Sequence, residues 1–101
     1  MIVETDKYYM PGKNRVILLP AVWREEFNIT ENDLLTVCKK DDSIIIIQAN
    51  TINEVKGAKY IKINKKGVIT IPKSIDEQLD IRLHQLFINS KYCSFFIAPV
   101  K

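Results

Sequence analysis

The residue types that carry out catalysis or bind metals are scarce in this chain, and their spacing does not group them. The chain has two cysteines, Cys38 and Cys93, and one histidine, His84, so no Cys/His cluster has metal-ligand spacing. No serine or cysteine comes with an evident base and orienting group. Asp41 and Asp42 form a carboxylate pair, but such pairs between strands usually shape turns. We therefore expect no enzyme, no cofactor and no metal site.

Size and charge set the next limits. The chain has 101 residues, with 15 Lys and Arg against 12 Asp and Glu and a formal net charge of +3. This mildly basic balance is compatible with nucleic-acid binding. The longest apolar run, Ile44–Ile47, is far shorter than the roughly 20 residues that span a bilayer. The acidic N-terminus does not have the pattern of a signal peptide. We expect one soluble, cytoplasmic domain.

The apolar pattern of the first half recurs 52 residues later. Two β-branched or apolar runs end at equivalent prolines, Pro20 and Pro72. Without a gap between Lys13 and Lys39, the comparison gives these identical pairs: Lys13 and Lys65, Val16 and Val68, Ile17 and Ile69, Glu25 and Glu77, Ile29 and Ile81, Leu34 and Leu86, Lys39 and Lys91. The pattern predicts a single domain, residues 1–101, built from two repeats at about 7–48 and 59–99. Residues 49–58 are the expected linker.

Each repeat predicts the same order of elements, namely strand, turn, strand, short helix and two further strands. Each proline suits the first turn of its helix, because that position needs no N–H group. Trp23 and Phe27 are four residues apart and share one helix face, as do Ile75 and Leu79. In the first repeat the predicted strands cover 7–10, 15–19, 34–39 and 43–48, around a helix at 21–28. In the second they cover 59–63, 67–71, 86–89 and 93–98, around a helix at 73–80.

This order of elements resembles the swapped-hairpin family that includes AbrB, SpoVT, the antitoxin MazE and MraZ. The matching segments are Arg15-Val-Ile-Leu-Leu-Pro20 and Asn32-Asp-Leu-Leu35 in the first repeat, and Gly67-Val-Ile-Thr-Ile-Pro72 and Leu86-Phe87 in the second. The resemblance implies a mainly β fold with short helices, in which two units interleave their hairpins into one small barrel. Both units lie on one chain here, so we expect either a single-chain pseudo-dimer or a homo-oligomer.

The resemblance also implies duplex DNA as the partner and transcriptional regulation as the function. Family members bind DNA through basic residues of the first hairpin and the helix start. Here those residues are Lys7, Lys13, Arg15, Arg24, Lys59, Lys62, Lys65, Lys66 and Lys73. Arg15 and Arg24 are the candidates for base contacts, and the lysines for phosphate contacts. The alternative is that these charges only solvate strand edges.

The two repeats differ where DNA would bind. Asp76 stands where the first repeat has Arg24, and with Glu77 it predicts a helix face that repels phosphate. Arg15 replaces the glycine that the second repeat keeps as Gly67. Unequal halves favour an asymmetric DNA site. A toxin-binding antitoxin, or another protein-binding module on the same barrel, remains the alternative function, although only Pro99-Val-Lys101 follows the last predicted strand.

Overall fold

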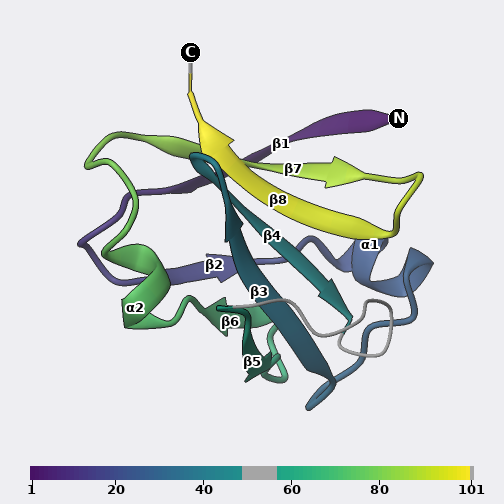
Figure 1. Cartoon of the computed structure of the whole chain (residues 1–101). Helices are drawn as coiled ribbons and strands as arrows, with labels where there is room; N and C mark the ends of the chain where they lie inside the picture. Colours follow the sequence, from purple (N-terminus) through teal and green to yellow (C-terminus); the bar gives the residue numbers. More distant parts are fainter. Residues whose placement is uncertain (49–56, 101) are drawn as a thin grey trace.

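A computed structural model describes residues 1–48 and 57–100 (Figure 1). Most of the expected linker at 49–58 lies outside the described residues. The described elements are mainly strands, with two short helices. In chain order they are β1 (Ile2–Tyr9), β2 (Val16–Leu18), α1 (Ala21–Glu26), β3 (Leu34–Lys40), β4 (Ser43–Gln48), β5 (Lys59–Lys62), β6 (Val68–Thr70), α2 (Lys73–Asp76), β7 (His84–Asn89) and β8 (Ser94–Pro99).

These strands form two antiparallel sheets. The larger sheet has the order β1-β7-β8-β4-β3-β5, and β2 pairs with β6 in a separate two-stranded ribbon. The described strands do not close into a barrel. No helix among the described residues is long and apolar enough to cross a membrane.

The two halves of the chain exchange their first strands. The strand β1 of the first half pairs with β7 of the second, and β5 of the second half pairs with β3 of the first. The strands β4 and β8 meet at the centre of the sheet, where Ile45 lies opposite Phe96. Exchanging the two halves reverses the strand order and leaves the pairing unchanged. Neither half therefore completes its own sheet.

One hydrophobic core lies between the large sheet, the ribbon and the helices. Ile44, Ile46, Phe95 and Ile97 point into it from the two central strands and are fully buried. The ribbon covers the core with Ile17 and Ile69, which are also buried. From α1, the aromatic ring of Trp23 lies 5.7 Å from that of Phe27, which meets Phe95 edge to face at 5.5 Å. Trp23 packs against the core but is only partly buried.

Both helices are shorter than the repeats predict, and the first strand is longer. The helix α1 ends at Glu26 because Asn28 adopts a left-handed φ of 57°. The amide of Ile29 then bonds the Arg24 carbonyl at 2.8 Å, which is the Schellman arrangement of a helix end. The helix α2 closes with bonds to residues three positions back. The strand β1 gains five residues at its start because Ile2, Val3 and Glu4 also pair with β7, beyond an irregularity between Glu4 and Tyr8.

The expected gap-free match between the repeats is correct through the helices but wrong beyond them. Leu35 pairs with Ile61, and His84 pairs with Tyr9 at the equivalent place in the other half. Leu35 and His84 are therefore equivalent, although they stand only 49 positions apart. The second half has three fewer residues between its proline and this position, and it has a longer turn between its last two strands. The identical pair Leu34 and Leu86 misled the comparison, since Leu34 is exposed and Leu86 is buried.

Candidate nucleic-acid interface

The ribbon of β2 and β6 is the element that gathers basic side chains from both halves. Its central pair is Ile17 and Ile69, and both side chains point into the core. On the other side the uncharged residues Val16, Leu18, Val68 and Thr70 are partly or fully exposed. Backbone bonds extend the ribbon at both ends, from the amide of Leu19 to Gly67 at 2.9 Å and from the amide of Ile71 to Arg15. The ribbon is therefore fixed over the core with one side free.

The first end of the ribbon carries three basic groups, Lys13, Arg15 and Lys73. With Gly12, Asp76 and Glu77 they line a hollow of about 230 Å³. Arg15 has a left-handed φ of 55°, and its guanidinium donates to the Ile71 carbonyl at 3.2 Å. The ammonium of Lys73 lies 3.8 Å from the exposed carboxylate of Glu77. Lys13 and Lys73 project from exposed positions, so this end is basic but partly neutralised.

The second end carries Lys65, Lys66 and Arg24. Both lysines stand in the turn before β6, where the Asn64 side-chain oxygen accepts bonds from the amides of Lys66 and Val68 at 2.9 Å each. Arg24 reaches this turn from α1, and its Nε donates to the Leu19 carbonyl at 2.7 Å. Its guanidinium lies over Gly67, where a Cβ atom would come within 2.4 Å of the Arg24 Cζ. Arg24 therefore occupies the space that the missing side chain leaves.

Asp76 holds the turn at the first end in place. The residue is only 5% exposed, and its carboxylate accepts hydrogen bonds from the Tyr9 hydroxyl and the Gly12 amide. Burial, together with the bond to Asp76, raises the pKa of Tyr9 far above its ordinary value. The expectation that the helix face of Asp76 and Glu77 repels phosphate stays a prediction, although the Asp76 carboxylate is buried and hydrogen-bonded. The exposed acid of this helix is Glu77.

The other expected DNA-binding residues lie outside the ribbon, on the edge strands of the large sheet. Lys7 lies in β1, and its ammonium is 3.7 Å from the Asp6 carboxylate. Lys59 and Lys62 lie in β5 and are exposed. Of the nine residues, the structure therefore places three at one end of the ribbon, three at the other and three on the sheet edges. Arg15 and Arg24 each donate one N–H group to a backbone carbonyl.

Sequence reasoning missed the residues that hold the two turns. Tyr9 and Gly12 support the first turn through Asp76, and Asn64 supports the second. The sequence carried part of this signal, since Arg24 and Asp76 stand at equivalent positions with opposite charges. That each of them contacts the turn of the other half could not be deduced without the strand exchange.

The structure also shows where the histidine and the two cysteines lie. His84 is fully buried, and its Nδ1 lies 2.7 Å from the Arg82 carbonyl. Burial raises the pKa of the Cys38 thiol, while Cys93 lies exposed in a turn. Among the residues that the structure describes, no three His, Cys, Asp or Glu side chains are grouped as metal ligands.

Comparison with family models, with curated proteins and with solved structures found no match to this chain. Its function is therefore argued from the geometry above.

Proposed function

We propose that this protein is a transcriptional regulator of the swapped-hairpin type, which binds duplex DNA through the ribbon of β2 and β6. The observation that carries the proposal is the pairing of the ribbon strands, which brings basic groups of both halves to the two ends of one exposed surface. The exchange of first strands between the halves supports a single-chain pseudo-dimer.

The shape of the ribbon suits the major groove of B-form DNA, which admits a two-stranded β-ribbon. Its outward side chains, the exposed Val16 and Thr70 and the partly exposed Val68 among them, are uncharged and small enough to approach base edges. Apolar and threonine side chains make contacts with the thymine methyl group. Basic groups at both ends would then reach the phosphates on either side of the groove, which fixes register without reading sequence.

The two ends offer different chemistry, so the DNA site is proposed to be asymmetric. The first end presents Lys13 and Arg15 beside an acidic residue, Glu77. The second presents Lys65 and Lys66 with Arg24 behind them. The remaining N–H groups of Arg15 and Arg24 are the candidates for bidentate contacts to guanine. A selected binding motif with strict two-fold symmetry would contradict this part of the proposal.

The test compares two double variants that remove the same charge from different places. Lys65→Ala/Lys66→Ala removes two exposed ammonium groups at the ribbon. Lys39→Ala/Lys91→Ala removes two at the hairpin ends of the large sheet, and it serves as the control. We expect the ribbon variant to bind a mixed-sequence DNA duplex at least tenfold more weakly at low salt, and the control to bind nearly as the unaltered protein does. Equal losses in both would overturn the assignment of the surface.

A second comparison tests the groove. The major groove of A-form RNA is deep and too narrow for protein side chains to read. We therefore expect DNA to bind more tightly than an RNA duplex of the same sequence. Equal affinity for the two would mean that the protein binds only to the phosphates, and would contradict insertion of the ribbon.

A further inference from the structure

The outer face of the large sheet, which points away from the core, is apolar across its centre. Four neighbouring strands place side chains in one lateral row there, because Cys38 lies opposite Ile45, Ile45 opposite Phe96, and Phe96 opposite Phe87. Partners directly opposite in antiparallel strands project from the same face of a sheet. The rings of Phe87 and Phe96 stack with centroids 5.1 Å apart. Each of these four side chains is partly accessible to solvent.

Further large apolar side chains on the edge strands widen this face. Tyr8 lies opposite Gln85, which puts it on the face of Phe87, and it is 53% exposed. Tyr60 lies opposite Thr36, on the face of Cys38, and it is 55% exposed. The solvated face of an antiparallel sheet is commonly polar, and large exposed apolar patches mark interaction sites. The inner face of the same strands already forms the core, so both faces of this sheet are apolar.

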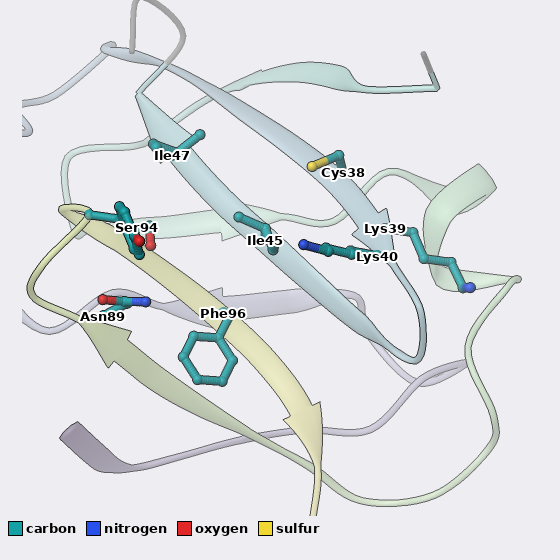
Figure 2. A pocket seen from close by; sticks show the side chains of 9 residues that line it. Cys38, Lys39, Lys40, Ile45, Ile47, Asn89, Ser94 and Phe96 are labelled. Carbon is teal, nitrogen blue, oxygen red and sulfur yellow. The ribbon is translucent and has the colours of Figure 1, made fainter. Parts of the chain in front are cut away.

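The face is also hollowed. A depression of about 520 Å³ is lined by residues of four strands and one turn: Cys38, Lys39, Lys40, Ile45, Ile47, Asn89, Tyr92, Ser94 and Phe96. Figure 2 shows Ile45 and Phe96 on its floor, with Ser94 and Asn89 toward one end and the Lys40 side chain extending beside Ile45. Among the residues that the structure describes, no acidic side chain lines it. Side chains from another sheet can fill such an apolar hollow.

We propose that this outer face is the interface between two copies of the chain, packed sheet against sheet. The large sheet belongs to a molecule that measures 32 × 28 × 25 Å, so its face is comparable to the roughly 800 Å² per partner that a stable interface buries. The apolar centre and charged margin also match the anatomy of protein interfaces, in which charges are depleted at the core.

The charges on this face favour a second copy of the same chain. Glu4 continues the central row on the β1 side, opposite Phe87, and Lys40 lies on the β3 side. A two-fold axis parallel to the central strands turns the β1 side of one copy onto the β3 side of the other. That operation brings Glu4 of each copy toward the Lys40 margin of its partner, which is the self-complementarity an isologous interface needs.

The interface does not depend on the proposed function, and the two surfaces do not compete. The ribbon of β2 and β6 covers the inner side of the sheet with Ile17 and Ile69. Two copies joined through their outer faces therefore leave both ribbons free, on opposite sides of the dimer.

Sedimentation equilibrium on the full chain, from about 1 to 500 μM, tests the proposal. We expect the mass to rise from that of one chain to that of two. Phe96→Glu and Ile45→Glu place a carboxylate at the centre of the face, and we expect each to raise the dimer dissociation constant at least a hundredfold. The matched control is Val22→Glu on α1, since Val22 is 71% exposed and lies off the sheet. We expect this control to dimerise like the unaltered protein.

Two results would overturn the proposal. One is that the unaltered protein has the mass of a single chain at every concentration. That result would mean that the outer face does not bind a second copy of the chain. The other is a dimer that both central variants retain while circular dichroism shows them folded. An NMR measurement on the unaltered protein tests the interface even if the variants fail to fold. The methyl resonances of Ile45 and Ile47 should shift with protein concentration, while those of Val22 should not. Concentration-independent resonances at Ile45 and Ile47 would contradict the interface.

Discussion

At the scale of single residues, Arg24 and Asp76 occupy the same position in the two repeats but make different contacts. They are equivalent in the two helices, and each contacts the hairpin turn of the other half. Arg24 lies over Gly67 and bonds the Leu19 carbonyl. Asp76 is buried and accepts bonds from Tyr9 and Gly12. The two halves are thus joined at one turn by an arginine and at the other by a buried aspartate. Each end of the ribbon therefore depends on a residue from the helix of the opposite half.

The bond from Tyr9 to Asp76 predicts a change in stability at neutral pH. In Tyr9→Phe the buried carboxylate keeps the Gly12 amide but loses the hydroxyl. Leaving a buried acceptor short of a partner costs about 1–3 kcal/mol. We expect a loss of that size in the free energy of unfolding, measured with urea at pH 7. The control is Tyr8→Phe, which removes an exposed hydroxyl next to it in the chain and should change stability little.

The same residue predicts how stability depends on alkaline pH. The pKa of Tyr9 is raised in the folded protein by burial and by Asp76, whereas the unfolded chain releases the phenol proton near pH 10. The folded state therefore binds more protons there, and the stabilisation present below about pH 10 is lost as the pH rises above it. The free energy of unfolding should fall more steeply between about pH 9.5 and 11 in the unaltered protein than in Tyr9→Phe. Parallel curves would contradict the buried, protonated phenol.

The contact of Arg24 with Gly67 can be separated from the backbone strain at that glycine. Gly67 has a φ of +84° and Gly57 a φ of +83°, but no atom of the described residues lies within 4 Å of a Cβ atom at Gly57. Gly57→Ala therefore measures the cost of the left-handed backbone alone, about 1–2 kcal/mol. Gly67→Ala must also displace the guanidinium from its bond to Leu19. We expect Gly67→Ala to lower the urea midpoint more than Gly57→Ala does, and Arg24→Ala to remove the excess. An equal effect of the two glycine variants would show that Arg24 does not occupy the space over Gly67.

At the scale of elements, the sequence predicted the existence and order of strands and helices better than their ends. The strand β4 lies at the predicted residues, because four consecutive isoleucines followed a clear turn. The helices ended early where Asn28 took a left-handed conformation and where α2 tightened after Asp76. The shift of three residues after the second helix was hidden, since Leu86, Phe87 and Ile88 are consecutive apolar residues and can match either face of the equivalent strand. Only the partners across the sheet decide between the two.

The corrected register explains an unusual core residue and predicts how it can be improved. His84 occupies the place that Leu35 fills in the other half, and both are fully buried. Among the described residues its Nε2 has no hydrogen-bond partner. The cost of an unpaired buried polar atom, about 1–3 kcal/mol, exceeds the net gain of one hydrogen bond. We expect His84→Leu to raise the free energy of unfolding by about 1 kcal/mol in urea, and the reciprocal Leu35→His to lower it. A destabilised His84→Leu would mean that the bond to Arg82 outweighs the unpaired nitrogen.

At the scale of the whole molecule, the exchange of strands between halves is the feature that local patterns could not give. It pairs residues far apart in the chain, such as Tyr9 with His84, and no propensity encodes such a pair. The resemblance implied both the interleaved hairpins and a closed barrel, whereas the described strands form an open sheet and a ribbon. The nine basic residues were chosen in the same way, and the fold sorted them into two ends of the ribbon and two sheet edges.

The binding of duplex DNA through the ribbon is the central claim, and its salt dependence tests it most directly. Each phosphate that a protein neutralises contributes about −0.9 to the slope of log K against log salt. Six basic side chains stand at the two ends of the ribbon, so the measurement on a mixed-sequence duplex, from 20 to 200 mM salt as a working range, should give a slope of about −3 to −5. Micromolar or tighter affinity is expected at the low end of that range. Absence of saturable binding at low salt, or a slope near zero, would contradict the claim and turn the search toward a protein partner.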